Sequence, residues 1–292
     1  MARRVKVLPA PAKTEGFVEV TKGIHTFVGG GGRTNFTLVL TDDKPVVIDN
    51  DIRARKRFLA GARRITRKSP GLLLNTHHNF DHTSDNGYYH AKGAVSFGCE
   101  VVREEMLREY NAGTWVKQML GRGPKVDHLV GKLGVEPPMV TFDDLLTVRY
   151  GGRIFQIIYI GHCHTRGDSV VWMPEERVLF SGDLLNHRTH PVARLGNFEN
   201  WLQALPLLKK FPARCIVPGH GPIPPRGTGI VDDVKGYLTR LRSRTAAALR
   251  REGAPVKASA RVRMDEYAKW FRPQLVPQNA LKMARELRQK RR

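Results

Sequence analysis

Three histidines and one aspartate lie within eight residues, directly after a short apolar run. The segment reads Asn75-Thr76-His77-His78-Asn79-Phe80-Asp81-His82, and it follows one glycine and three leucines at residues 71 to 74. Imidazoles and carboxylates are the ligands that zinc, iron and manganese take in catalytic sites. The leucines predict a short buried strand, and polar side chains at the end of such a strand are typical of a functional sheet edge. We therefore interpret the segment as a metal site.

Further ligand-type residues follow three later apolar runs. They lie in the blocks Gly161-His162-Cys163-His164-Thr165-Arg166-Gly167-Asp168, Phe180-Ser181-Gly182-Asp183 and Val217-Pro218-Gly219-His220-Gly221. A single histidine in such a place is more often an ordinary loop residue. Its recurrence at the ends of several predicted strands favours one shared metal centre.

In this order the four blocks resemble the metallo-β-lactamase fold superfamily, over roughly residues 17 to 225. That superfamily carries an H-x-H-x-D-H motif after a strand, a later histidine before Thr-x-Gly-Asp, a bridging Gly-Asp and a final Pro-Gly-His-Gly. The resemblance implies a first metal held by His77, Asn79 and His164 and a second held by Asp81, His82 and His220. Asp183 would lie between them, and Asp81 would also orient the attacking water or take a proton from it.

Asn79 departs from the family pattern, which usually has histidine at this position. An amide oxygen is a neutral, weak donor toward zinc, so we expect the first site to hold its metal more loosely than the second. The expected cofactor is a divalent metal, zinc first, with iron or manganese as alternatives. His78 and His162 could compensate as ligands, and together with His187 and His190 they are candidates for substrate contact. The competing interpretation for all four is a plain loop or supporting histidine.

The composition is that of an ordinary enzyme. A chain of 292 residues with 41% hydrophobic content can bury a large core. Three scattered cysteines do not make a disulfide framework and fit a reducing compartment. There is no apolar run of the ~18 residues that a membrane span needs, and no secretory segment follows the basic first residues. We therefore expect a cytoplasmic protein without membrane contact.

The charge is strongly positive, with 49 Lys and Arg against 27 Asp and Glu, a net +22. Such a field attracts nucleic acid or steers a small anionic substrate. The basic residues are spread along the chain and no nucleic-acid module accompanies them. Nuclease relatives also carry a large inserted domain for which this length leaves no room. We therefore expect a small-molecule substrate and no nucleic-acid partner.

Alternation and turn residues predict strands at residues 17–20, 24–28, 36–40, 45–49, 71–74, 94–97, 146–150, 153–159, 169–173, 177–180 and 214–217. Helices are predicted at 53–68, 100–110, 199–210, 232–252, 263–271 and 279–289, and the resemblance adds a short one at 85–89. The fold class is α/β: an αββα four-layer sandwich over residues 17–228, with an arm at 1–16. Residues 229–292 form a helical C-terminal extension packed on it, with homo-oligomer contacts or pocket closure as its candidate roles.

The predicted function is metal-dependent hydrolysis of an ester, lactone, thioester or related bond. A divalent cation lowers the pKa of a bound water from about 15.7 toward ~7, which makes hydroxide available at neutral pH. Two alternatives stay open: an iron-dependent redox or oxygen enzyme on the same fold, and a nuclease or nucleic-acid-binding protein. The substrate itself is not determined by the sequence, because it depends on the pocket.

Overall fold

The computed structural model describes residue 8 and residues 15–117, 120, 124–131, 133–225 and 227–290. Most of the predicted arm at residues 1 to 16 lies outside these ranges. Leu8 is described: its N–H donates to the carbonyl of Glu266 over 2.8 Å, and its side chain packs against the core of the C-terminal half.

The first sheet has seven strands in the order β1-β2-β3-β4-β5-β6-β7. They are β1 (Gly16–Thr21), β2 (Ile24–Val28), β3 (Phe36–Val39), β4 (Val46–Ile48), β5 (Leu72–Leu74), β6 (Val95–Cys99) and β7 (Val140–Phe142). Pairing is antiparallel from β1 to β4 and parallel from β4 to β7. The three leucines of β5 are buried, as expected for a parallel strand covered on both faces.

The second sheet has five strands in the order β12-β11-β10-β9-β8. They are β8 (Leu145–Tyr150), β9 (Arg153–Gly161), β10 (Asp168–Met173), β11 (Val178–Phe180) and β12 (Cys215–Val217). β11 and β12 run parallel, and the other neighbours run antiparallel. The end of β9, the start of β10 and the ends of β11 and β12 therefore lie at one edge.

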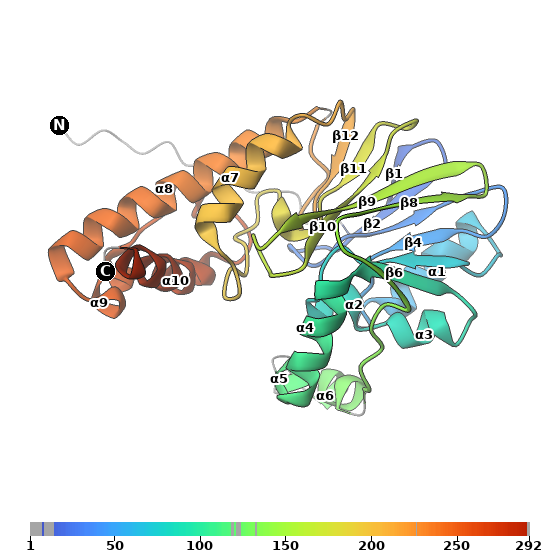
Figure 1. The fold of residues 1–292 in the computed structure, drawn as a ribbon, viewed down its shortest axis with the longest axis horizontal. Coiled ribbons are helices and arrows are strands. Elements are labelled where there is room, and N and C mark those ends of the chain that lie inside the picture. Colours follow the sequence, from blue (N-terminus) through green and yellow to red (C-terminus); the bar gives the residue numbers. More distant parts are fainter. Residues whose placement is uncertain are drawn as a thin grey trace.

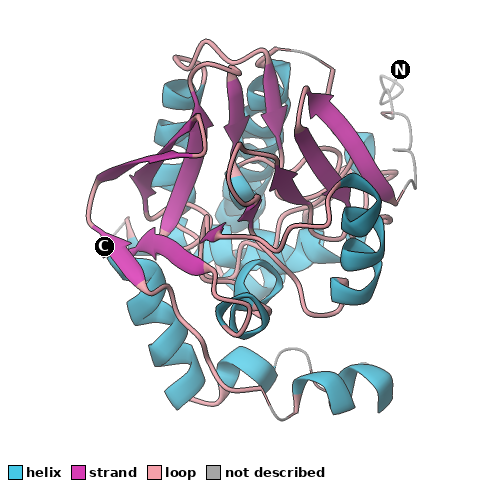
Figure 2. Ribbon diagram, turned by 90° about the vertical axis from the view of Figure 1, so that its right-hand side faces the viewer, coloured by secondary structure: helices cyan, strands magenta, loops and turns pink. Residues whose placement is uncertain are grey.

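The two sheets pack face to face, and helices cover their outer faces (Figures 1 and 2). One apolar cluster joins the sheets, with members such as Ile48 and Leu74 from the first and Val171 and Phe180 from the second. Helices α1 (Arg55–Ile65) and α3 (Asn86–His90) pack on the first sheet, whereas α7 (Phe198–Leu208), α8 (Gly229–Glu252) and α10 (Val276–Gln289) pack on the second. This arrangement confirms the predicted αββα sandwich with C-terminal helices.

A helical insertion lies between β6 and β7, the last two strands of the first sheet. It comprises α4 (Glu100–Asn111), α5 (Thr114–Lys117) and α6 (Pro124–Val130), and Figure 1 shows the three helices together below the strands. Trp115 is buried with its ring 5.0 Å from that of Phe80, in α2 (Phe80–Thr83), so the insertion packs directly behind the histidine motif.

The C-terminal extension corrects one prediction. Instead of a helix over residues 263 to 271, the chain has α9 (Pro255–Arg261) and the 3-10 turns η2 (Asp265–Tyr267) and η3 (Pro273–Leu275). Tyr267 and Trp270 have helical spacing, but their rings meet edge to face at 4.6 Å. Trp270 stacks on Tyr237 of α8, and Tyr267 contacts the same ring edge to face. Pro273 also disfavours helical geometry at the residue before it. Among the described residues, no helix is long and apolar enough to cross a bilayer.

Candidate metal centre

The predicted ligands converge because each follows a strand that ends at the same edge. His77 and His82 follow β5, and His164 lies in the turn between β9 and β10. Asp183 lies on η1 (Gly182–Leu184) after β11, and His220 follows β12. Residues that are more than 130 positions apart in the chain are thus brought to one point between the two sheets.

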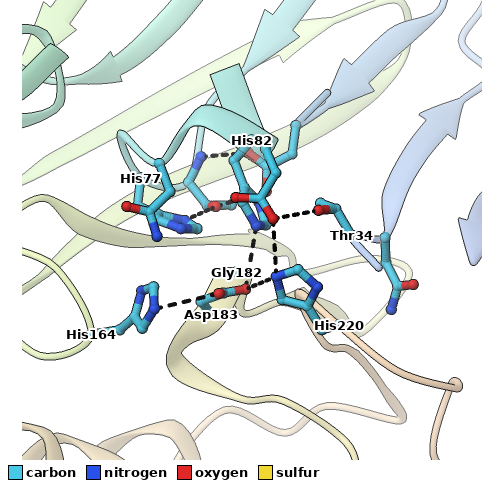
Figure 3. A network of polar contacts seen from close by, with 12 residues as sticks. Thr34, His77, His82, His164, Gly182, Asp183 and His220 are labelled. Atoms are coloured by element: carbon cyan, nitrogen blue, oxygen red, sulfur yellow. Dashed lines mark hydrogen bonds and ion pairs between the residues drawn. The ribbon is translucent and has the colours of Figure 1, made fainter. Parts of the chain in front are cut away.

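Asp183 lies at the centre of this group, as Figure 3 shows, with His164 on one side and His82 and His220 on the other. Its Oδ1 atom is 3.3 Å from His82 Nε2 and 3.2 Å from His220 Nε2. Its Oδ2 atom is 3.5 Å from His164 Nε2. The carboxylate thus faces three imidazoles, which is the placement that the resemblance implies for a bridging ligand.

Two compact sets of ligand atoms share His82. One set is His77, His82 and Asp183, and the other is Asp81, His82 and His220; within each set all ligand atoms lie within 4.8 Å of one another. The sequence assigned His82 to the second metal alone, together with Asp81 and His220. The structure places it against both groups, while the assignment of each residue to a particular metal stays a prediction.

The buried polar atoms at this centre fit a cation. The Nε2 atoms of His77, His82 and His164 and the Oδ1 atom of Asp183 are buried and, apart from the ion-pair contacts around Asp183, have no hydrogen-bond partner among the described residues. Leaving such groups unpaired costs roughly 1–3 kcal/mol each. A metal that accepts these lone pairs would remove that cost, and imidazole with carboxylate is a donor set that suits zinc, iron or manganese.

Supporting residues contact the other side of three of the ligands. Asp49 Oδ2 lies 2.9 Å from His82 Nδ1, and the Gly32 carbonyl lies 3.1 Å from His220 Nδ1. Thr34 Oγ1 donates to Asp81 Oδ2 over 2.9 Å. Such contacts fix the ring tautomer and orientation in metal sites. The sequence analysis missed them, although Asp49, a polar residue directly after strand β4 at the ligand edge, carried a usable signal.

The pKa shifts follow from burial and from the carboxylates. Burial lowers the pKa of His77 well below its ordinary value and that of His164 to about 4, which favours the neutral rings that bind metals. Burial also lowers the pKa of His82, but Asp183 and Asp49 outweigh it and raise that pKa well above the ordinary value. A cation between His82 and Asp183 would replace the ring proton as the positive charge at this place.

Two glycines let the backbone approach Asp183 closely. A Cβ atom on Gly219 would lie 2.1 Å from Asp183 Oδ1, and one on Gly182, whose φ is +48°, would lie 2.5 Å from Thr76 Oγ1. Neither position has room for a side chain. The glycines of the Ser-Gly-Asp and Pro-Gly-His blocks therefore bring β11 and β12 against the motif that follows β5.

Asn79 lies beside the centre, directly before α2, and lines the cavity above it. Its Oδ1 atom is buried and has no hydrogen-bond partner among the described residues, and it does not cap the helix that follows. The amide oxygen is therefore available as a ligand. Its predicted role at a weakened first site stays a prediction.

The four other histidines that the sequence analysis singled out lie away from the cavity wall, as far as the structure describes it. His78 is buried with both ring nitrogens unpaired, and burial lowers its pKa to about 3. His162 Nε2 lies 2.8 Å from the Leu195 carbonyl, and His187 Nδ1 lies 2.8 Å from that of Pro222. His190 lies between Tyr237 and Tyr267 and joins the C-terminal helices to the site loops. Their predicted substrate contacts remain predictions.

A cavity of about 210 Å³ opens over the centre. Asn79, Asp81, Asp183 and His220 line it together with Arg53, Arg194, Arg272, Val192, Gln274 and Leu275. Arg53 is paired with Asp51 over 2.6 Å and lies 3.8 Å from Asp81, and Arg194 is paired with Glu109 over 3.4 Å. The sequence analysis did not single out these arginines, because they come from three distant parts of the chain.

Comparison with known proteins agrees with this geometry. The family model of the metallo-beta-lactamase superfamily matches residues 29–220, more than half of the chain. A type 2 metallo-beta-lactamase of Bacteroides fragilis is 35% identical over 125 residues, which cover 40% of this chain and 49% of that protein. One of Bacillus cereus is 28% identical over 106 residues, 34% of this chain and 41% of that protein. The matches thus span half or less of these relatives' length.

Solved structures show the same fold. A metallo-beta-lactamase from Pontibacter korlensis has a TM-score of 0.62 at 17% identity and covers 77% of this chain and 99% of its own. The sec-alkylsulfatase Pisa1 from Pseudomonas sp. has a TM-score of 0.68 at 15% identity and covers 93% of this chain and 50% of its own. The match of the family model over more than half of the chain confirms the predicted family: the chain belongs to the metallo-beta-lactamase superfamily, and this membership supports the prediction of a metallo-hydrolase.

Proposed function

We propose that this protein is a metal-dependent hydrolase that acts on a small anionic substrate with an ester, lactone, thioester or related bond. The observation that carries the proposal is a set of buried ligand atoms without hydrogen-bond partners beneath a cavity with three arginines in its wall. Zinc suits the imidazole and carboxylate donors best, and manganese or iron are the alternatives.

The residues that would hold the metal are the two sets that share His82, with His164 and Asn79 beside them. A divalent metal bound there would supply hydroxide near neutral pH and polarise the oxygen of the scissile bond. Asp81 lines the cavity with its Oδ2 atom fixed by Thr34, so it can orient the attacking water and accept its proton. Burial alone would raise the pKa of Asp81, but His82, His220 and Arg53 lower it well below its usual value, which keeps the carboxylate ionised.

The arginines of the wall support an anionic substrate. Three guanidinium groups face two carboxylates there, and the net charge of +22 adds a long-range attraction for anions. Val192 and Leu275 offer apolar contact beside them. A sulfate ester is a second candidate substrate, because the likeness to the sec-alkylsulfatase extends over 93% of this chain and a sulfate ester carries its own negative charge.

Two other functions make different predictions. An iron-dependent redox enzyme would need iron for activity and would consume oxygen. A nucleic-acid-binding protein would shift DNA or RNA in a salt-sensitive way without turnover of any ester. A cavity of about 210 Å³ suits part of a small molecule, which favours an enzyme with a small substrate over a nucleic-acid-binding protein. The identity of the metal separates hydrolysis from the iron-dependent reaction.

The deciding experiment removes the metal and restores it. Protein stripped with a chelator is reloaded with zinc, manganese or ferrous iron and assayed on carboxylic esters, lactones, thioesters and alkyl sulfates, with oxygen consumption recorded in parallel. We expect turnover that is lost with the metal and restored best by zinc. Oxygen consumption restored by iron alone, or no turnover with any metal, would contradict the proposal.

We also propose a cytoplasmic location and no nucleic-acid partner. The three cysteines are free in the structure, and Cys99 and Cys163 are buried, as suits a reducing compartment. The predicted homo-oligomer contacts of the C-terminal extension stay a prediction.

A further inference from the structure

The segment at residues 271 to 275 of the C-terminal extension docks on the loops of the metal centre. The Phe271 N–H donates to the Arg188 carbonyl over 3.0 Å, and the Phe271 carbonyl accepts from the His190 N–H over 3.0 Å. The Phe271 side chain lies against Gly32, where a Cβ atom would be only 2.6 Å from it. Because the Gly32 carbonyl contacts His220, this segment lies directly behind a predicted metal ligand.

Arg272, the next residue, has left-handed backbone angles, with φ +61° and ψ +45°. This conformation is unfavourable for a long L side chain, and it is tolerated better by glycine or asparagine. Non-glycine residues in such conformations are concentrated at functional sites. The flanking bonds of Phe271 and the Leu275 N–H, which donates to the Arg272 carbonyl over 3.1 Å, hold the backbone in place.

Arg272 lines two neighbouring cavities. One is the cavity over the metal centre, and the other, of about 370 Å³, has Asp51, Arg33, Arg53 and Arg57 in its wall beside Arg272. The other arginines of these walls have carboxylate partners: Asp51 for Arg53, Glu109 for Arg194, and Glu15 for Arg33 and Arg57. Within the described part of the chain, no carboxylate lies within ion-pair distance of Arg272.

We propose that Arg272 is a specificity-determining residue that binds an anionic group of the substrate at the junction of the two cavities. This inference rests on the proposed hydrolase function and specifies the residue that binds the charged group of the substrate. The scissile bond lies in the first cavity beside Asp81, and a carboxylate, sulfate or phosphate group away from that bond pairs with Arg272. The C-terminal extension thereby completes the substrate site.

The test compares a neutral ester, p-nitrophenyl acetate, with an anionic one, the p-nitrophenyl monoester of succinate. The variants are Arg272→Asn, which tolerates the left-handed backbone and removes the charge, and Arg272→Lys, which keeps the charge. Arg177→Asn is the matched control, because Arg177 is also left-handed, with φ +56°, but lies in the turn between β10 and β11. The Arg177→Asn variant controls for the removal of one positive charge and of one arginine with left-handed backbone angles.

We expect Arg272→Asn to lower kcat/KM for the anionic ester about 10- to 100-fold, chiefly through KM, the range for losing one hydrogen bond to a charged group. The neutral ester should change less than about twofold, Arg272→Lys should recover part of the loss, and Arg177→Asn should match the wild type. An equal loss on both esters would assign Arg272 a structural role only. No loss on either ester would exclude it from the substrate site.

A binding measurement separates this inference from the proposed function. Succinate is titrated calorimetrically into zinc-loaded wild type and Arg272→Asn, independently of turnover. Binding that is at least about tenfold weaker in the variant supports the anion site even if neither ester is hydrolysed, in which case only the proposed activity fails. Equal binding in the two proteins overturns the role of Arg272 whatever the activity.

Discussion

Asp49 and His82 are 33 residues apart in the chain, and Asp49 Oδ2 lies 2.9 Å from His82 Nδ1. Asp49 also accepts the Thr76 N–H and hydroxyl over 2.8 and 2.7 Å, so both carboxylate oxygens are fixed. The contact turns His82 Nε2 toward Asp183, 3.3 Å away. His82 belongs to both sets of ligand atoms. The Asp49 carboxylate, which is in neither set, therefore orients the ring that the two sets share.

Asp49→Asn is therefore expected to weaken zinc binding about 10- to 100-fold, the usual cost of losing a partner of a metal-binding histidine. Competition against a zinc-chelating dye measures the affinity. The exposed Asp232, which pairs with Lys209 on the surface, provides the matched control Asp232→Asn. Unchanged zinc affinity in a folded Asp49→Asn variant would contradict the orienting role.

Asp81→Ala and His220→Ala should each lower turnover by orders of magnitude while the fold is retained. His220→Ala removes an imidazole from one set of ligand atoms. Asp81→Ala removes a ligand oxygen and also the group that accepts a proton, a role that contributes about 10²–10⁴-fold to the rate. Steady-state kinetics with circular dichroism on each variant measure both quantities. Near-normal kcat in a folded Asp81→Ala protein would defeat this assignment.

Asn79→His should raise the metal content of the purified protein. A neutral amide oxygen holds zinc less firmly than an imidazole, so the wild type should carry close to one tightly bound metal per chain and the variant about two. Elemental analysis of both proteins, prepared alike, gives the stoichiometry. Two tight metals in the wild type would mean that Asn79, His78 or His162 already supplies a good ligand.

The activity on an anionic substrate should depend on salt. The excess of 49 − 27 = 22 positive charges creates a field that attracts anions, and ~0.1 M salt screens it beyond about 10 Å. We expect kcat/KM to fall with added salt while kcat barely changes. If kcat/KM is independent of salt, the surface charge does not steer the substrate.

Much of the fold followed from local patterns. The strand predicted at residues 24–28 coincides with β2 (Ile24–Val28), and the leucines at 72 to 74 form β5 as expected, because apolar runs with turn residues at their ends are local signals. The helix predicted over 53–68 is shorter, Arg55–Ile65. At its start Asp51 binds the Arg53 side chain and backbone N–H, and at its end Thr66 has extended backbone angles. Such local contacts at helix ends leave only a weak trace in sequence.

The residues around the ligands were harder to predict. Thr34 and Asp81 are 47 positions apart, and the Gly32 carbonyl and His220 are 188 apart, so no local pattern joins them. The sequence analysis predicted a helix over residues 263–271 from the spacing of aromatic residues. It therefore missed that the segment at residues 271 to 275 contributes to the cavity wall. Tertiary packing of Tyr267 and Trp270 against Tyr237 overrode that spacing and turned the chain toward the metal centre.

The candidate ligands come from both layers of the sandwich: His77 and His82 follow the first sheet, and Asp183 and His220 follow the second. A cation held by them would add a cross-link between layers that are also joined by apolar side chains and by hydrogen bonds such as that of Asn35 to the Pro218 carbonyl. Its binding free energy is then added to the cohesion between the sheets, with about 1.4 kcal/mol for each tenfold rise of free metal above the dissociation constant. The supply of metal would thus set the stability of the folded protein, as well as whether the centre can react.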